Sequence, residues 1–169
     1  MNNEPLEIER KFLIRYPDLE MLEKTCSRKY CIVQTYLLSD NTKSRRIRKR
    51  ESTDGTDYWY NEKVRLSDMT RIEHEREISE EEYLELMKEA SSDARTIFKT
   101  RYYIPSGEHC FEVDVFPEWN DRAFAEVELE DEKQAFEFPD CLSLIREVTA
   151  DRRYTNLSLA INGFVFDEI

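Results

Sequence analysis

The feature that most constrains the fold of this chain is a short alternating run that recurs about eight times. In each run, β-branched and aromatic residues alternate with charged residues, which is the two-residue period of a β-strand. The runs predict strands at residues 5–15, 31–39, 43–51, 56–65, 71–78, 95–104, 109–116 and 123–131. Turn-forming stretches such as SDNTK, TDGTD and PSGE separate several of them, so an antiparallel order is expected. About eight antiparallel strands with few helices form either a closed barrel or a sandwich.

Only a few helices are expected between these strands. One short helix is predicted over 17–24 and a second over 79–91, where Ser79 and Glu82 have the spacing of a capping box. The C-terminal third, from DEKQAFEF onward, is expected to form short helices and turns. The 169 residues are enough for one domain, 1–169, of the α+β class and mainly β.

The predicted strands carry charges mainly of one sign on one face. The stretch EIERKFLI places Glu7, Glu9 and Lys11 on one side, opposite mostly apolar residues. Similar faces are formed by Arg46, Arg48 and Arg50, by Arg71, Glu73, Glu75 and Glu77, by Lys99, Arg101 and Tyr103, by Glu112 and Asp114, and by Glu126, Glu128 and Glu130. Such faces either lie in water or turn inward around a ligand. The grouping by sign favours the second interpretation, because like charges two residues apart repel unless an opposite charge lies between them.

Charged faces that turn inward would suit one kind of ligand. An eight-stranded barrel encloses a lumen for one small molecule. Arg and Lys would bind an oxygen-rich anion through charge-assisted hydrogen bonds. Carboxylates would hold a hard cation such as Mg²⁺ or Mn²⁺. Both groups in one lumen suit a metal–polyphosphate complex.

Other classes of partner are disfavoured. The net charge of −12 provides no overall positive field that would attract nucleic acid or an anionic membrane. No apolar run has the length of a signal-peptide core or a membrane span, which predicts a cytoplasmic protein. The four cysteines show no C-x-x-C spacing, and HEREI at His74 is not an H-E-x-x-H pair, so no zinc site is expected.

The first strand also resembles a known signature. EIERKF is similar to the E-x-E-x-K motif of the CYTH domain, which the triphosphate tunnel metalloenzymes share. It is followed in order by QTYLLS, RRIRKR, EK, RIEHEREI, FKTRYYI, FEVDVF, AEVELE and EVTADRRYTNLSLA, so the resemblance covers almost the whole chain. The short bacterial members, largely inorganic triphosphatases, are the most similar. The resemblance implies a closed eight-stranded antiparallel β-barrel, a tunnel open at both ends, with flanking short helices and a C-terminal helix.

The resemblance further implies roles for individual residues. The substrate-binding residues would be Lys11, Arg46, Arg48, Lys63, Lys99 and Arg101, with Arg153 a further candidate. The ligands of Mg²⁺ or Mn²⁺ would be Glu7, Glu9, Glu126 and Glu128, with Asp114 close by. The catalytic set would be Glu7, Glu9, Lys11, Glu73 and Lys99. Glu73 and Glu75 would help to place metal or water, or balance the basic strands. Any of Glu7, Glu9 and Glu73 could orient the attacking water.

A few further residues receive structural interpretations. Lys49 and Arg50 are expected at an exposed strand end and are left out of the site, and Trp59 and Trp119 are assigned to packing. Tyr36 is either a tunnel-side or a core residue. The C-terminal helix YTNLSLAINGF contains no lysine, where some relatives carry basic residues.

The predicted function is divalent-metal-dependent hydrolysis of inorganic triphosphate, and also of nucleoside triphosphates, by a monomer or homodimer. Three alternatives are open. A class IV type adenylyl cyclase would need a nucleoside pocket, for which no motif is present, and a thiamine triphosphatase would need an aromatic cradle such as Tyr58 and Tyr60. A non-catalytic polyphosphate-binding module would keep the bases and lose the carboxylates. Because both sets are present, catalysis is favoured.

Overall fold

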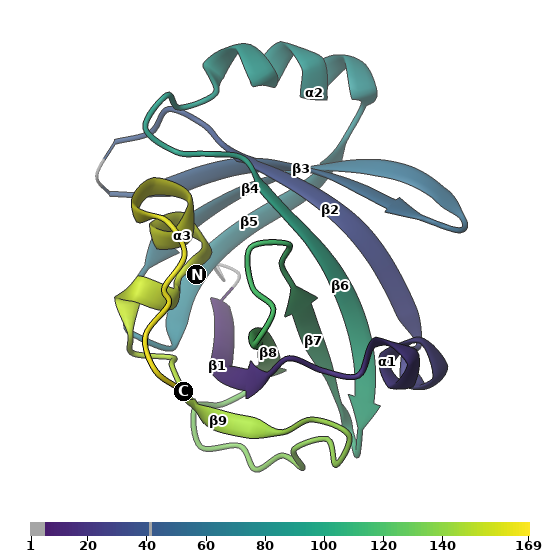
Figure 1. Ribbon diagram of the computed structural model, residues 1–169. Helices are drawn as coiled ribbons and strands as arrows, with labels where there is room; N and C mark the ends of the chain where they lie inside the picture. Colours follow the sequence, from purple (N-terminus) through teal and green to yellow (C-terminus); the bar gives the residue numbers. More distant parts are fainter. Residues whose placement is uncertain (1–5, 41) are drawn as a thin grey trace.

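A closed β-barrel is the central feature of the computed structural model, which describes residues 6–40 and 42–169 (Figure 1). Its strands are β1 (Leu6–Arg15), β2 (Arg28–Tyr36), β3 (Ser44–Ser52), β4 (Gly55–Arg65), β5 (Thr70–Ile78), β6 (Ile97–Ser106), β7 (His109–Val115) and β8 (Arg122–Leu129). Their order is β5-β4-β3-β2-β6-β7-β8-β1, and antiparallel pairing of β1 with β5 closes the ring. The eight predicted strands and the barrel are thus confirmed. The predicted start of the first strand, residue 5, lies outside the described residues.

A ninth strand, β9 (Leu144–Glu147), corrects the prediction for the C-terminal third, where only helices and turns are expected. β5 pairs with β1 only at residues 6–8, and β9 pairs with the same edge of β1 at residues 12–14. Four residues are too few to distinguish a strand from a turn by periodicity. The strand forms because β1 has an edge that β5 leaves unpaired, and it brings the C-terminal segment into the barrel wall.

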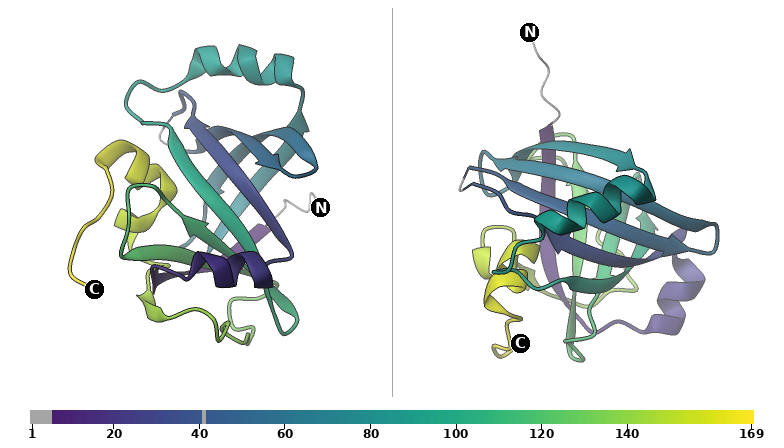
Figure 2. Two further views of the ribbon diagram at one scale, coloured as in Figure 1. Left: turned by 45° about the vertical axis from the view of Figure 1, so that its right-hand side comes forward. Right: turned by 90° about the horizontal axis from the view of Figure 1, so that it is seen from above.

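Three short α-helices flank the barrel in the described part of the chain (Figures 1 and 2). Helix α1 (Leu19–Thr25) begins after Asp18, whose carboxylate accepts hydrogen bonds from two backbone N–H groups. Helix α2 (Glu80–Leu86) continues into a 3₁₀ turn, Met87–Glu89, and the predicted cap is present, since Ser79 Oγ accepts from the N–H of Glu82 at 3.1 Å. Helix α3 (Asn156–Asn162) is the predicted C-terminal helix and follows a second 3₁₀ turn, Arg152–Tyr154.

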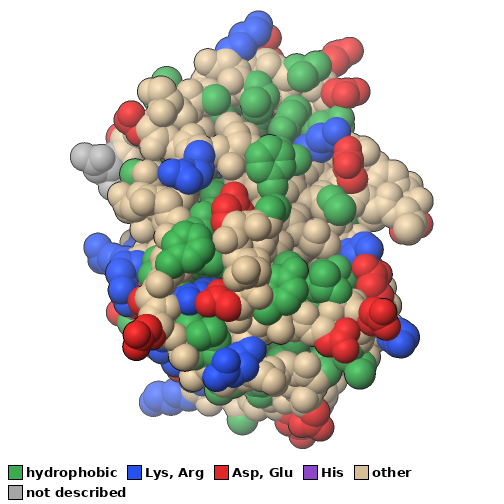
Figure 3. All heavy atoms as spheres, in the orientation of Figure 1, with side chains coloured by type: hydrophobic (Ala, Val, Ile, Leu, Met, Phe, Trp, Pro, Cys, Tyr) green, Lys and Arg blue, Asp and Glu red, His purple; other side chains and the backbone are tan. Residues whose placement is uncertain are grey.

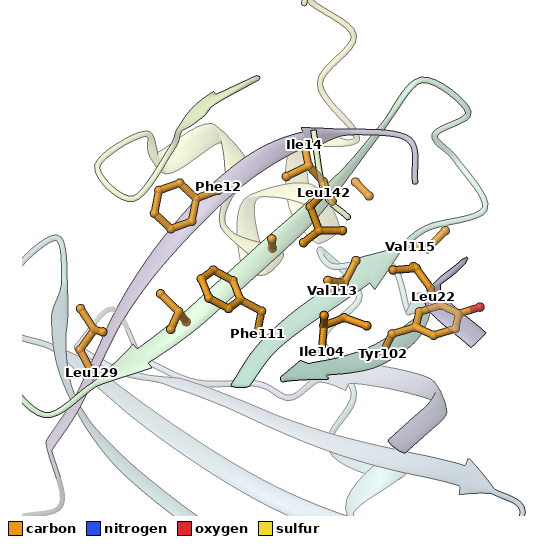
Figure 4. Packing of buried hydrophobic residues seen from close by; sticks show 13 residues of the cluster. Phe12, Ile14, Leu22, Tyr102, Ile104, Phe111, Val113, Val115, Leu129 and Leu142 are labelled. Carbon is orange, nitrogen blue, oxygen red and sulfur yellow. The ribbon is translucent and has the colours of Figure 1, made fainter. Parts of the chain in front are cut away.

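The outer faces of β1, β6, β7 and β8 form the largest apolar cluster (Figure 4). Phe12 and Phe111 are buried there, and both contact Phe138 from the segment after β8, with ring centroids 5.4 and 5.3 Å away. Leu22 of α1 covers another part of this surface. Because successive side chains on a strand point to opposite faces, most charged residues of these four strands face the barrel interior, whereas Arg10 lies on the outer face beside Phe12 and pairs with Glu147.

The interior is itself divided between apolar and charged residues. Leu13 and Phe124 share a strand face with Lys11 and Glu126, and they pack with Trp119 and the C-terminal Tyr154. Trp119 is 2% exposed, which confirms its assignment to packing. One end of the interior is therefore filled by apolar side chains, and the charged residues occupy the remainder. None of the helices in the described ranges is long and apolar enough to cross a membrane.

Candidate active site

The barrel interior contains a cavity of about 990 Å³. The predicted site residues on its lining are Glu7, Glu9, Lys11, Arg46, Arg48, Lys63, Glu73, Arg101, Glu126 and Glu128. Lys99, Asp114 and Arg153 are not on the lining. On the outer face shown in Figure 3, by contrast, acidic and basic side chains are interspersed. The inward interpretation of the charged faces therefore agrees with the geometry of these strands.

Strand pairing explains why these residues meet. Antiparallel pairing of β1 with β8 places Glu9 opposite Glu128 and Lys11 opposite Glu126. Directly opposite side chains lie close together on one face of a sheet. Lys11 Nζ lies 2.8 Å from Glu126 Oε1 and 3.9 Å from the centroid of the Phe124 ring. Lys11 thus stands where the acidic wall meets the apolar end of the interior.

Two arginines of β3 have unsatisfied donors in the interior. Arg46 lies 3.9 Å from its nearest carboxylate, Glu73, and Arg48 contacts Glu75 at 2.5 Å. The Nε atoms of both arginines are buried and have no hydrogen-bond partner among the described residues. A buried donor without a partner costs about 1–3 kcal/mol. The wall formed by β3 therefore has unused capacity to bind an anion.

A coupled pair of carboxylates lies beside this wall. Lys63 Nζ is 2.6 Å from Glu7 Oε2 and 3.3 Å from Glu73 Oε1. Burial, together with the charges of Glu9 and Glu73, raises the pKa of Glu7 to about 8. Burial also opposes ionisation of Glu73, but the hydrogen bond from Glu7 and the charges of Lys63 and Arg46 outweigh it and lower the pKa of Glu73 to about 2. The contact between the two carboxylates therefore favours the proton on Glu7 and the negative charge on Glu73.

Acidic residues of β1, β7 and β8 form the opposite wall. Partial burial and the charges of Glu112, Glu73 and Glu9 raise the pKa of Glu128. Glu128 has no ion pair with any base in the described ranges, whereas Glu9 pairs with Arg71. An unpaired carboxylate among other carboxylates has the oxygen donors that a hard divalent cation prefers. Within residues 6–40 and 42–169, however, no three acidic, His or Cys side chains form a ready-made metal site.

Two predicted residues lie behind the cavity. Asp114 is fully buried and accepts hydrogen bonds from Lys99 Nζ at 2.6 Å and from Arg101 Nε and Nη2 at 2.7 Å. Burial and the neighbouring charge of Arg101 lower the pKa of Lys99 to about 7. Of these three residues only Arg101 is on the cavity lining.

The C-terminal segment forms one rim of the cavity. Its position is held at Lys11, whose N–H donates to Thr149 Oγ1 at 2.9 Å and whose carbonyl accepts from the N–H of Val148 at 2.8 Å. Arg152 lies on the lining, whereas the neighbouring Arg153, the predicted substrate ligand, does not; it pairs with Asp151 at the rim and lies 3.7 Å from Asp167. Adjacent residues of a 3₁₀ turn point in different directions, and the two-residue period of a strand does not apply there.

Arg71, Arg50 and Tyr36 are among the further residues that lie on the lining without having been assigned to the site. Arg71 lies two residues before Glu73 on the same strand face, and this spacing could have predicted its place on the lining. Arg50 shares the face of Arg46 and Arg48, but it forms two hydrogen bonds with Asp57 and its guanidinium lies 4.7 Å from the Trp59 ring. Tyr36 is both a buried core residue and part of the lining, so its two interpretations are compatible.

The described residues thus define a class of protein, a closed antiparallel barrel with basic and acidic walls around an internal cavity. Two curated relatives match nearly the whole chain. The inorganic triphosphatase of Acetivibrio thermocellus is 32% identical over 94% of this chain and 95% of its own length. The inorganic triphosphatase of Nitrosomonas europaea is 35% identical over 92% of this chain and 97% of its own length.

A solved structure agrees with these matches. The crystal structure of the inorganic triphosphatase NE1496 has a TM-score of 0.55 and 30% identity, covering 92% of this chain and 94% of that one. No family model matches the sequence. Identity above 30% across almost the full length of both chains shows that this chain belongs to the inorganic triphosphatase family.

Proposed function

We propose that this protein hydrolyses inorganic triphosphate to phosphate and pyrophosphate in the barrel cavity, with the help of a divalent cation. The names of the two curated relatives support this substrate. The more specific assignment to the CYTH domain of the triphosphate tunnel metalloenzymes rests on the motif series that begins with EIERKF.

The observation that carries the proposal is the pair of unsatisfied arginines on β3. Arg46 and Arg48 are buried at the cavity, and neither Nε has a partner among the described residues. An anion with many oxygens, such as triphosphate, would accept hydrogen bonds from both and offset their burial. Lys11, Lys63 and Arg101 add further charge on the same lining.

The acidic wall provides carboxylate oxygens, which are the donors that a divalent cation prefers. Glu9 of β1 and Glu128 of β8 lie directly opposite each other and would hold the ion. Glu7 lies two residues before Glu9 on the same face of β1, and Glu126 lies two residues before Glu128 on the same face of β8. When bound, a Mg²⁺ or Mn²⁺ ion would neutralise phosphate charge and help to activate water. These carboxylates would move closer together when the ion binds, because in the structure they pair with bases or do not form a ready-made group of metal ligands among the described residues.

The remaining chemistry falls to the side chains. Water attacks the terminal phosphorus, the bond from that phosphorus to the bridging oxygen breaks, and pyrophosphate leaves. Arg46, Arg48 and Lys63 would stabilise the charge on the phosphate oxygens, which is the main demand of phosphoryl transfer. Glu73 is the ionised member of the coupled carboxylate pair, so it is the better acceptor for a hydrogen bond from water, while Glu7 holds the proton.

The test is phosphate release from inorganic triphosphate and from ATP, measured with Mg²⁺, with Mn²⁺ and with EDTA, beside an assay for cyclic AMP. We expect metal-dependent release from triphosphate that collapses in Lys11→Ala and Glu9→Gln. Lys49→Ala and Glu51→Gln are matched controls, because these two residues pair with each other outside the cavity lining. Formation of cyclic AMP without phosphate release would replace the proposal by a cyclase. Tight triphosphate binding without turnover would replace it by a binding module.

A further inference from the structure

Asp114 is isolated from the cavity by the two bases that it contacts. Its side chain is fully buried, and its two carboxylate oxygens accept three hydrogen bonds, one from Lys99 and two from Arg101. These bonds are 2.6–2.7 Å long, as is usual when both partners are charged. A buried carboxylate with this set of partners has little capacity left for another ligand.

The contact with Arg101 has a particular geometry. Asp114 binds Nε and Nη2 of Arg101 together, which is the two-pronged pairing that determines the plane of a guanidinium. The same guanidinium contacts Glu112 through Nη1 and lies 3.7 Å from Glu126. Arg101 is itself 6% exposed and lies on the cavity lining. The contact that holds its plane therefore comes from behind the cavity.

We propose that Asp114 is a positioning residue, which orients Arg101 toward the substrate anion and holds Lys99 beside it, and that it is not a metal ligand. This inference rests on the proposed function, because it assigns Asp114 a task in the binding of the same anion. A cation that used the oxygens of Asp114 would have to displace two bases and then lie beside their charges. The carboxylate of Glu128 lies on the lining, pairs with no base in the described ranges and presents no such obstacle, and Glu9 opposite it pairs with one base, Arg71.

Asp114→Asn distinguishes three possible roles of Asp114: it could position Arg101, bind a metal ion, or act only through its negative charge. The amide keeps the shape but can accept at only one atom, so Arg101 loses half of its two-pronged contact. Misplacement of a binding group typically lowers rates by about 100-fold, and we expect kcat/KM for triphosphate to fall by at least about tenfold. The Mg²⁺ concentration that gives half-maximal rate should stay within about twofold of the wild-type value, because no metal ligand has been removed.

Two results would overturn the proposal. If Asp114 were a metal ligand, the half-maximal Mg²⁺ concentration would rise sharply, and saturating Mg²⁺ would restore kcat/KM. If Asp114 acted only through its charge, loss of a negative group beside the cavity would tighten the binding of triphosphate. Calorimetric titration of triphosphate in EDTA measures that binding directly. It also separates this inference from the proposed function, because a wild type that binds triphosphate but does not turn it over contradicts only the function.

Asp121→Asn is the matched control. Asp121 makes the same two-pronged contact, with Nε and Nη2 of Arg122 at 2.9 and 2.8 Å, but it does not line the cavity. Its substitution should leave kcat/KM unchanged. Should Asp114→Asn fail to fold, Arg101→Lys is the second test, since lysine keeps the charge and cannot form the two-pronged contact. Wild-type kcat/KM in Arg101→Lys would overturn the proposal, and a loss of about tenfold or more would support it.

Discussion

Arg48→Met is expected to make the protein more stable and less active at the same time. Arg48 is 5% exposed, and its Nε has no partner among the described residues. Burial and the charge of Arg46 lower the pKa of Arg48, so folding disfavours its charge. Methionine would remove the buried donor, which costs about 1–3 kcal/mol, and retain most of the side-chain volume. The lost ion pair, to the partly exposed Glu75, is worth at most about 1 kcal/mol. The free energy of unfolding should therefore rise by about 1–2 kcal/mol.

The loss of activity has the same origin. A hydrogen bond to a charged group contributes about 1.5–3 kcal/mol, and about 1.4 kcal/mol corresponds to a factor of ten. The variant should therefore lose about 10–100-fold in kcat/KM for triphosphate. Urea unfolding measures the first quantity and phosphate release the second, both on the same preparation.

Arg45→Met provides the control for this prediction. Arg45 precedes Arg46 on β3 and points away from the cavity, where it donates to the Tyr60 hydroxyl at 3.0 Å and to Glu89 at 2.9 Å. These bonds are satisfied, so their removal should lower stability by about 1 kcal/mol and leave kcat/KM unchanged. The reasoning is refuted if Arg48→Met is destabilised by more than about 1 kcal/mol, or if it keeps wild-type activity.

Three further predictions follow. Glu7 has a pKa of about 8 in the folded protein against an ordinary 4.5, so its contribution to stability falls as pH rises through that interval. The glutamine of Glu7→Gln cannot ionise, so in EDTA the free energy of unfolding of the variant should exceed that of the wild type by an amount that grows to a few kcal/mol between about pH 5 and 8. The same pH dependence of the free energy of unfolding in both proteins, measured by urea unfolding, would contradict this. Glu128→Gln should raise the melting temperature in EDTA by relieving repulsion, and raise the half-maximal Mg²⁺ concentration by about tenfold, while an unchanged Mg²⁺ requirement would remove Glu128 from the metal site. Phe111→Ala, in the outer apolar cluster, should lose about 3–5 kcal/mol in urea unfolding but keep its kcat/KM while folded; a large change in KM would show that the outer packing shapes the cavity.

The strand pattern was predictable because it is local. Alternation of apolar and charged residues follows from the opposite directions of successive side chains, so the sequence places Arg46 and Arg48 on one face without knowledge of the fold. The same reasoning groups Glu126 with Glu128. Ser79 as a helix cap is equally local, because its partner is three residues away.

Position along the barrel axis was not predictable in this way. Glu112 and Asp114 share one face of β7, yet only Glu112 lines the cavity. Asp114 is covered because Lys99 and Arg101 come from β6, a strand paired with β7 by the barrel topology. The sequence predicts Arg153 as a substrate ligand, but Arg152 is the residue on the lining. This difference depends likewise on how the C-terminal turn is held by its hydrogen bonds to Lys11.

The sequence by itself determines where strands form and which residues share a face, because backbone geometry and side-chain alternation act within a few residues. Only the tertiary structure decides which face is interior, how deep each charge lies and which bases each carboxylate meets. These properties depend on the pairing of β1 with β8, β5 and β9, and those strands are separated from β1 by about a third of the chain or more. The free energy of such pairings comes from the burial of surface between strands that are distant in the sequence, and the sequence of one strand describes only one of the two surfaces that meet.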